Sequence, residues 1–272
     1  MPDQIRCKAV DTVTSRQNPV VRRFRAAGDP SGDVLLLDGA HLIEEALAAS
    51  VSLELVAIDD TARADVAALA RRAQALGARV ISVPSKVLAA MSPVRQPSGI
   101  VAIARRQERA LAEALAHPPQ LVLLLDEVQD PGNVGAIVRA AEACGATGVI
   151  AGQGTADPMG WKALRGSMGS IFRLPVAVRQ SLPEAVAAAR AMGIEIVAAV
   201  PRDGVLLPDC DLRRPVAVLL GGEGGGLPDS LVALATTRLS IPMRPPVESL
   251  NVATAAALIA YEAQRQRGGA SS

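Results

Sequence analysis

Five consecutive apolar residues, Leu121 to Leu125, restrict the possible folds of this 272-residue chain more than any other stretch. An apolar run without alternation is typical of a strand buried on both faces, as in a parallel sheet covered by helices. A second such run, Val216 to Leu220, leads directly into a glycine-rich loop. Stretches with helical spacing, such as Val134 to Cys144, lie between the runs. The sequence therefore predicts an α/β layer fold.

Short apolar runs also alternate with amphipathic stretches from Val34 to Ala104, which predicts a first, smaller α/β domain. Arg105 to Pro119 is charged, rich in alanine, and ends in His-Pro-Pro. A helical linker with a rigid end has this composition. We therefore predict an N-terminal domain over residues 1–110, a linker over 111–119, and a C-terminal domain over 120–268.

The bulk properties limit the possible partners. A formal net charge of +1 excludes a strongly basic nucleic-acid wrapper but permits a local basic patch. The three cysteines, Cys7, Cys144 and Cys210, are far apart and show no metal-ligand spacing, so we expect no metal site and a reducing, cytoplasmic location. Residues 1–8 contain no apolar signal core, and no run approaches the ~20 apolar residues of a membrane span, so we expect no membrane partner.

The segment from Thr12 to Arg25 is rich in arginine. Ser15 or Asn18 is suited to cap a short helix with Pro19 at its first position. Two interpretations of the cationic cluster remain open: a solvated helix face, or a patch that contacts phosphates. The cluster consists of Arg16, Arg22, Arg23 and Arg25. With only four aromatic residues in the chain, base stacking is not expected as the main mode of recognition.

The loop from Gly221 to Gly226 has glycine at every position except Glu223. So many glycines require positive φ angles or close approach of another group, and both a flexible turn and a binding loop satisfy this. A phosphate-binding P-loop is excluded, because the loop ends in Gly-Leu-Pro without the required lysine. The dinucleotide-binding fingerprint also fails, because it belongs to the first strand of its unit. What remains is a loop that permits a non-phosphate ligand to approach the backbone.

Two further features follow buried strands. Asn133 and Asn251 each precede a helical stretch and are suited to cap it. Arg139 lies about 200° round the helix from Ile137 and so points away from the buried stripe, where it could hold an anion or an alkoxide. Capping and solvation explain each residue alone, but not their occurrence in this order at strand ends.

Three segments together resemble the sequence motifs of the SpoU/TrmH family, which comprises RNA ribose 2'-O-methyltransferases. They are Asn133-x-Gly-Ala-x-x-Arg139, Gly221-Gly-Glu-Gly-x-Gly-Leu227 with Ile241-Pro-Met243, and Ser249-Leu-Asn-Val-Ala-x-Ala255. The N-terminal segments Ser15-Arg-Gln-Asn-Pro-Val, Leu37-Asp-Gly-Ala-His-Leu-Ile and Pro97-Ser-Gly-Ile-Val-Ala resemble that family's substrate-binding domain, which is similar to a small ribosomal protein. The likeness covers most of the chain.

The resemblance implies a C-terminal domain with a deep trefoil knot, an exception to the general absence of knots. It implies S-adenosylmethionine as cofactor, held by the knot loops in a homodimer whose site is completed at the interface. The cofactor-binding residues carried over from the motifs are Gly221, Gly222, Ile241, Met243, Ser249 and Leu250. The catalytic residues carried over are Arg139, Asn133, Glu223 and Asn251.

In the family, the arginine that matches Arg139 is assigned as catalytic base or alkoxide stabiliser, with the match to Asn133 holding it. A guanidinium has a pKa above ~12, which makes it a poor proton acceptor. We therefore expect Arg139 to stabilise the developing alkoxide electrostatically. Glu223 is expected to orient Arg139 or a backbone donor, and Asn251 to support the loop.

The expected substrate is structured RNA, 23S-type ribosomal RNA before transfer RNA. A non-catalytic RNA-binding or ribosome-assembly factor is the main alternative, and a nucleotide-binding hydrolase is a third hypothesis that the missing lysine disfavours. Two departures from the family pattern concern the substrate. His41 stands where the family commonly has an arginine, and Pro245-Pro246 stiffens the approach to Ser249.

Overall fold

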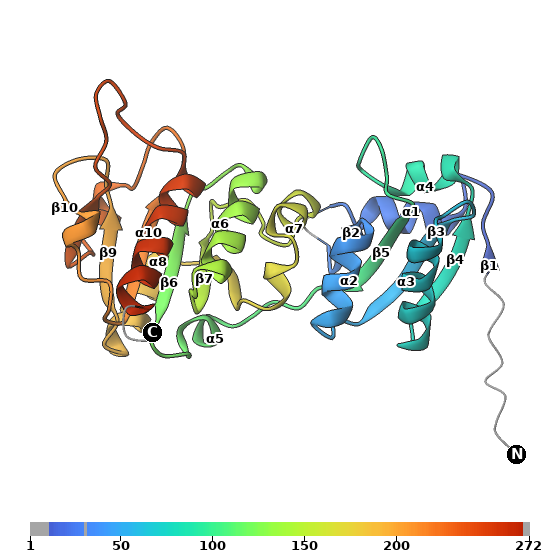
Figure 1. The fold of residues 1–272 in the computed structure, drawn as a ribbon, viewed down its shortest axis with the longest axis horizontal. Helices are drawn as coiled ribbons and strands as arrows, with labels where there is room; N and C mark the ends of the chain where they lie inside the picture. The colour runs from blue at the N-terminus through green and yellow to red at the C-terminus, as the bar shows by residue number, and fades with distance from the viewer. Residues whose placement is uncertain (1–10, 30–31, 269–272) are drawn as a thin grey trace, which may run out of the picture. The chain divides into compact units, whose positions relative to one another are not determined.

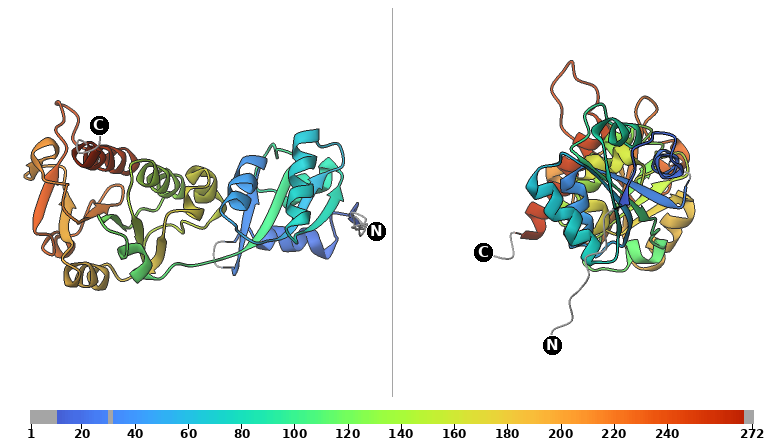
Figure 2. Two further views of the ribbon diagram at one scale, coloured as in Figure 1. Left: turned by 60° about the horizontal axis from the view of Figure 1, so that its bottom comes forward. Right: turned by 90° about the vertical axis from the view of Figure 1, so that its right-hand side faces the viewer.

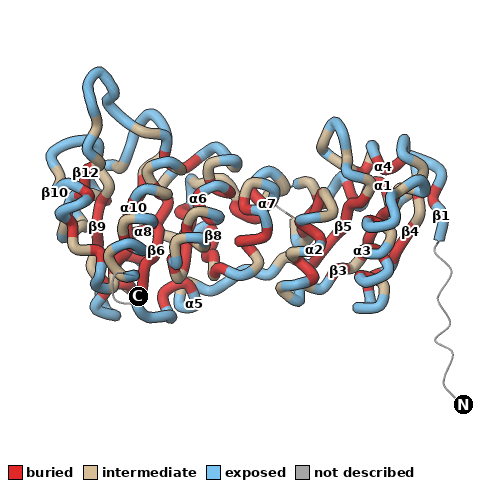
Figure 3. The backbone as a smooth tube through the Cα atoms, viewed as in Figure 1, coloured by how far each residue is buried: buried red, intermediate tan, exposed pale blue. Residues whose placement is uncertain are grey.

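The computed structural model of the chain describes residues 11–29 and 32–268 and divides into two compact units, one ending at Arg106 and the other beginning at Gln107 (Figure 1). Cys7 and the N-terminal segment searched for a signal sequence lie outside the described residues. Both units are α/β, as predicted. Strands in both sheets are largely buried, while connecting loops are exposed (Figure 3).

The first unit is built on a five-stranded mixed sheet with strand order β1-β4-β3-β5-β2. β3 pairs parallel with β4 and antiparallel with β5, and β5 pairs antiparallel with β2. The elements are β1 (Asp11–Thr12), α1 (Pro19–Ala26), β2 (Val34–Asp38), α2 (Ala40–Ala48), β3 (Leu53–Asp59), α3 (Ala64–Ala75), β4 (Arg79–Val83), α4 (Ser85–Met91) and β5 (Ile100–Arg105). The predicted cap of α1 is confirmed: the Asn18 side chain accepts a hydrogen bond from the Val20 N–H, and Pro19 begins the helix.

The second unit is built on a seven-stranded sheet in which every pairing is parallel, with strand order β10-β12-β9-β11-β6-β7-β8. Its first elements are α5 (Leu111–Leu115), β6 (Leu121–Asp126), α6 (Pro131–Ala143), β7 (Gly148–Gly152), α7 (Trp161–Ser167), η1 (Ser170–Phe172), β8 (Val176–Gln180) and α8 (Leu182–Ala191). The remaining elements are β9 (Glu195–Ala199), β10 (Val205–Leu206), η2 (Leu207–Asp209), β11 (Val216–Gly221), α9 (Asp229–Val232), β12 (Thr237–Ser240) and α10 (Val252–Gly268).

Helices cover both faces of this sheet, with α6 and α10 on one face and α8 on the other (Figure 2). The strand from Leu121 to Leu125 is fully buried, as its unbroken apolar run predicts. α5 and α8 pack on the same face as Val122 and Leu124. Ala114 and Leu115 of α5 are buried in this core, and residues 111–119, predicted as a linker, all belong to the second unit.

Three details differ from the sequence-based expectations. α6 begins at Pro131 and its N-cap is Asp130, whose carboxylate accepts from the Gly132 N–H at 2.8 Å, so the assignment of Asn133 as N-cap is wrong. The sequence suggests a strand from Leu239 to Met243, but β12 ends at Ser240 and the residues that follow form a loop. β8, α7 and α8 were not predicted.

β6 and β11 form the switch point of the sheet. Beside β6 the sheet continues through β7 and β8, and beside β11 it continues in the other direction through β9, β12 and β10. Gly221, the last residue of β11, lies in register with Asp126, the last residue of β6. Open α/β sheets bind ligands at the carboxyl ends of the strands on either side of such a point.

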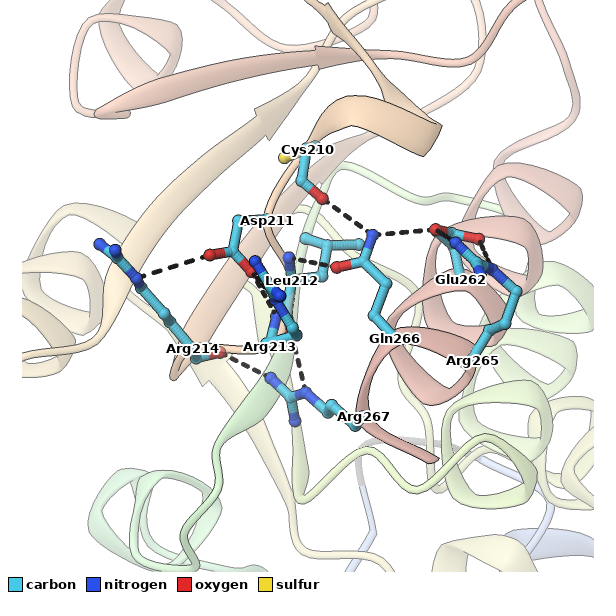
Figure 4. A network of polar contacts seen from close by, with 9 residues as sticks. All are labelled: Cys210, Asp211, Leu212, Arg213, Arg214, Glu262, Arg265, Gln266 and Arg267. Atoms are coloured by element: carbon cyan, nitrogen blue, oxygen red, sulfur yellow. Dashed lines mark hydrogen bonds and ion pairs between the residues drawn. The ribbon is translucent and has the colours of Figure 1, made fainter. Parts of the chain in front are cut away.

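At the opposite end of these strands, Arg267 fastens the last turn of α10 (Figure 4). Its guanidinium donates four hydrogen bonds of 2.8–3.0 Å to backbone carbonyls, those of Pro119, Gln120, Leu212 and Arg214. Burial lowers the pKa of Arg267 from its usual value, but the four carbonyl dipoles compensate the charge. The contact joins α10 to the residues that precede β6 and β11.

Gln266 adds a second attachment at this end of α10 (Figure 4). Its side chain accepts from the Leu212 N–H at 2.8 Å and donates to the Cys210 carbonyl at 2.9 Å and to the Glu262 carboxylate at 2.8 Å. Arg265 and Gln266 together lower the pKa of Glu262 to about 2. The end of α10 is therefore held by side chains that a hydrophobicity pattern does not reveal.

Candidate active site

Three of the four expected catalytic side chains meet at the carboxyl end of the parallel sheet. The Asn133 amide donates to the Glu223 carboxylate. The Asn251 amide donates to the same Glu223 oxygen and to the Asn133 side-chain oxygen, both at 3.2 Å. Each of the three family-like motifs therefore supplies one member of a single polar cluster.

Helix ends position this cluster. Asn133 lies in the first turn of α6, and Asn251 caps α10 by accepting from the backbone N–H groups of Ala253 at 3.0 Å and Thr254 at 3.2 Å. The capping role predicted for Asn251 is thus confirmed. The N-terminal ends of α6 and α10 therefore both lie next to the Glu223 carboxylate. Within one chain the Glu223 carboxylate accepts from these two amides, and the expectation that it orients Arg139 or a backbone donor stays a prediction.

The glycines beside Glu223 are required by the protein's own backbone. A Cβ atom on Gly222 would lie 2.0 Å from the Glu127 carbonyl oxygen, and one on Gly221 would lie 2.2 Å from the Gly226 carbonyl carbon. Both separations are far shorter than any real contact. Gly226 has a φ of +65°, which favours glycine for a different reason. The sequence suggests that a ligand approaches these glycines. In the structure, Gly222 is instead close to the loop after β6, and Gly221 is close to the other end of the glycine loop itself.

Gly222→Ala is expected to displace this loop and weaken cofactor binding at least tenfold, because the new methyl group overlaps the Glu127 carbonyl. Gly225→Ala is the matched control, since a Cβ at that position meets nothing within 4 Å. Isothermal titration with S-adenosylmethionine measures the effect. Equal affinities in the two variants would contradict the assignment of Gly222 to a fixed wall of the site.

The loop between β12 and α10 has the character of a cofactor site. Ile241, Met243 and Leu250 are half-buried, while Ser249 is exposed. In the described part of the chain, the backbone N–H groups of Ile241, Met243 and Leu250 have no protein acceptor. Apolar side chains next to free backbone donors suit a ligand with an apolar face and polar edges, such as adenosine. The predicted cofactor residues therefore fit that group.

Asp126 and Glu127 belong to the same edge and were not singled out in the sequence. Asp126 is half-buried at the end of β6, and burial, with a smaller contribution from Glu127, raises the pKa of its carboxyl. Glu127 has a φ of +49°, which turns its carbonyl towards Gly222. A carboxylate directly after a fully apolar strand was the signal available in the sequence.

Arg139 is not part of the cluster. It is exposed on α6, and no hydrogen bond or ion pair to it is present in the described part of the chain. Arg139 follows Asn133 by six residues, which is about 240° round the helix and ~9 Å along it. Within one chain the two side chains therefore face different directions, and the expected contact between Asn133 and Arg139 is absent.

The four arginines of the N-terminal cluster have different environments. Arg23 forms an ion pair with Glu54, and Arg16 and Arg25 donate to carbonyls of α4. Arg22 is exposed. Among residues 11–29 and 32–268, no three His, Cys, Asp or Glu side chains are grouped as metal ligands, and no helix is both long and apolar enough to cross a membrane.

Known proteins match both units. The SpoU rRNA Methylase family matches residues 120–261, and the family described as RNA 2'-O ribose methyltransferase substrate binding matches residues 36–110. A tRNA/rRNA methyltransferase of Synechocystis sp. is 36% identical over 266 residues, which is 96% of this chain and 96% of that protein. A 23S rRNA (guanosine(2553)-2'-O)-methyltransferase of Bacillus subtilis is 36% identical over 44% of this chain and 48% of its own length.

A solved structure agrees over almost the whole length. The crystal structure of an AdoMet-bound rRNA methyltransferase from Sinorhizobium meliloti superimposes with a TM-score of 0.85 and 30% identity, covering 94% of this chain and 98% of that one. The match includes both units, and its bound cofactor is the one that the loops at the carboxyl edge fit. The chain belongs to the SpoU family of S-adenosylmethionine-dependent RNA 2'-O-methyltransferases.

Proposed function

We propose that this protein methylates a ribose 2'-hydroxyl of ribosomal RNA, of the 23S type. The observation that carries the proposal is the cluster of Asn133, Glu223 and Asn251 beside the glycine loop. A pure RNA-binding factor has no need to bring these three side chains together at the switch point of the sheet. A nucleotide hydrolase is disfavoured because this loop carries no lysine.

S-adenosylmethionine supplies a methyl group on a sulfonium, which is a strong electrophile without further activation. The main-chain groups of Gly221, Gly222 and the loop from Ile241 to Leu250 would hold this cofactor. The protein must then hold the ribose hydroxyl near ~3 Å from that methyl group and stabilise the charge that develops on the oxygen. We assign this stabilisation to Arg139, with the polar cluster fixing the loops around it.

The position of Arg139 supports a site shared between two copies of the chain. Its guanidinium faces away from the cluster of its own chain, so we propose that it serves the cluster of a second copy in a homodimer. α10 offers a surface for this contact. Leu258 and Tyr261 lie three residues apart on one face of the helix and are 41% and 60% exposed.

Replacing both Leu258 and Tyr261 by glutamate is expected to give a monomer, because two charges would be buried in the apolar centre of the interface. Size-exclusion chromatography with light scattering measures the mass. Leu76→Glu is the control, since Leu76 is 66% exposed but belongs to the first unit. A dimer that persists in the double variant would exclude this face as the interface.

The choice of ribosomal RNA rests on the extent of the matches. The S. meliloti rRNA methyltransferase matches both units, whereas the tRNA (guanosine(18)-2'-O)-methyltransferase of Escherichia coli matches 38% of this chain. Transfer RNA is therefore the second candidate. We also propose a trefoil knot, supported by the packing of α10 back against α6, β6 and β11, and a cytoplasmic location where RNA is available.

The decisive experiment is transfer of a labelled methyl group from S-adenosylmethionine to total RNA of a bacterial strain that lacks this enzyme. Label in 23S ribosomal RNA, resistant to alkali at a single ribose, is the expected result. Label in transfer RNA would establish the second candidate. The absence of label in any RNA, with intact cofactor binding, would favour the binding-factor hypothesis.

A further inference from the structure

Two arginines of the N-terminal cluster are fastened to α4 in the same way. The Arg16 Nε donates to the Lys86 carbonyl at 3.0 Å, and the Arg25 Nε donates to the Ala90 carbonyl at 2.9 Å. The two carbonyls are four residues apart, about one helical turn or ~6 Å along α4. In the described part of the chain neither guanidinium has another polar partner. Their terminal Nη groups are therefore held in place but free to donate.

The geometry of α1 decides which other arginines share this side. Val21 and Phe24 define its buried face. At about 100° per residue, Arg22 and Arg25 fall on one flank of that face, and Arg23 falls on the opposite flank. The structure agrees, because Arg25 contacts α4 whereas Arg23 pairs with Glu54 of β3. Arg22 thus lies on the same side as Arg25, one turn away.

In the described part of the chain no ion pair involves the cations on this side, although the Asp59 carboxylate bonds to Ser85 at the start of α4. α1 and α4 contain no aspartate or glutamate. Glu54 interacts with Arg23 and Arg105, on the other flank. Arg16, Arg22, Arg25 and Lys86 are all exposed. We call these four residues the α1/α4 ridge.

We propose that the α1/α4 ridge binds consecutive phosphates of the substrate RNA. The proposal rests on RNA being the substrate and identifies a surface of the first unit that holds it. Guanidinium groups fixed through Nε present their remaining N–H groups to phosphate with little further loss of side-chain freedom. α1 lies outside residues 36–110, the range matched by the family's substrate-binding domain.

The chemistry of the ridge indicates recognition of the backbone and not of bases. The only aromatic residue of α1, Phe24, is fully buried, so no ring is available for stacking. Contacts to phosphates fix the register and orientation of a nucleic acid without reading its sequence. The ridge would therefore orient the RNA, while its sequence or shape is read elsewhere.

The test compares two full-length triple variants with the same change in charge. One carries Arg16→Gln, Arg22→Gln and Arg25→Gln. The matched control carries Arg23→Gln, Arg71→Gln and Arg72→Gln, which removes three exposed arginines outside the ridge. Filter binding of an unmodified 23S ribosomal RNA transcript is measured between 50 and 200 mM KCl, with methyl transfer and S-adenosylmethionine affinity measured in parallel.

The ridge variant is expected to bind RNA at least tenfold more weakly at 50 mM KCl. The slope of log affinity against log salt should become less steep by about 2 to 3, since each phosphate contact contributes ~0.7–0.9. The control should keep the slope of the unaltered protein, and both variants should keep cofactor affinity. Arg16→Lys with Arg25→Lys should keep most of the slope, because the charges remain.

Equal slopes in the two triple variants would overturn the proposal, as would a ridge variant whose only change is its oligomeric mass in the absence of RNA. The latter would make the ridge a protein interface. Failure of the proposed function is recognised separately. In that case the unaltered protein transfers no methyl group to any RNA, while the difference in slope between the variants persists.

Discussion

Arg139→Ala is expected to reduce methyl transfer by at least ~100-fold and to leave S-adenosylmethionine affinity within a few-fold. Removal of one donor that stabilises a developing oxyanion typically costs 10²–10³ in kcat. The residue is exposed and has no partner in the described part of the chain, so the fold should not depend on it. Single-turnover transfer to the substrate RNA, together with calorimetry of cofactor binding, measures both quantities.

Arg71→Ala serves as the control, since Arg71 is an exposed helical arginine of the first unit. Unchanged turnover in Arg139→Ala would remove this residue from the mechanism. Mixing the Arg139→Ala chain with a Glu223→Ala chain tests whether the site is shared. If Arg139 acts on the cluster of the second copy, a mixed dimer contains one intact site and one doubly impaired site. Each mixed dimer should then have about half the activity of the unaltered dimer.

Arg267→Met is expected to destabilise the second unit by at least ~3 kcal/mol. The substitution keeps an apolar stem of similar length but leaves the carbonyls of Pro119, Leu212 and Arg214 without their donor, while the Gln120 carbonyl still accepts from the Val216 N–H. An unsatisfied buried group costs ~1–3 kcal/mol, and water can replace only part of the loss. Urea unfolding followed by circular dichroism measures the change.

Arg213→Met is the matched control for this experiment. Arg213 pairs with Asp211 at the surface with 69% of its side chain exposed, and solvent screens such pairs so that they add little to stability. A destabilisation of similar size in both variants would show that the four carbonyl contacts of Arg267 do not hold the end of α10. Weaker cofactor binding by Arg267→Met alone would show that the attachment also determines the position of Asn251, at the other end of the same helix.

The fold was largely predictable, because its signals are local. The unbroken apolar run from Leu121 to Leu125 predicted a strand buried on both faces, and the caps Asn18 and Asn251 were identified from the residues that follow them. β8 was missed since its apolar stretch is short and ends in Val-Arg-Gln. The start of α6 was misplaced because Asp130 and Asn133 are both suitable caps, and Pro131 at the first helical position favours the earlier one.

The three members of the polar cluster were predictable, but their arrangement and the separate position of Arg139 were not. The order of the motifs identified Asn133, Glu223 and Asn251, but periodicity does not show that one carboxylate accepts from both amides. Glycine is required at position 222 because the Glu127 carbonyl lies against it. Glu127 is 95 residues away in the sequence, and no local pattern links the two positions. The four carbonyl partners of Arg267 are likewise brought together only by the sheet. Contacts that depend on topology are outside the reach of a sequence pattern.

Asn251 uses both ends of one amide group. Its oxygen closes the first turn of α10, and its nitrogen binds Glu223 and Asn133. The first turn of α10 and the polar cluster therefore share one side chain, so the order of each depends on the order of the other. A chain whose last helix has not yet formed lacks the residue that joins Asn133 and Glu223 to the C-terminal segment.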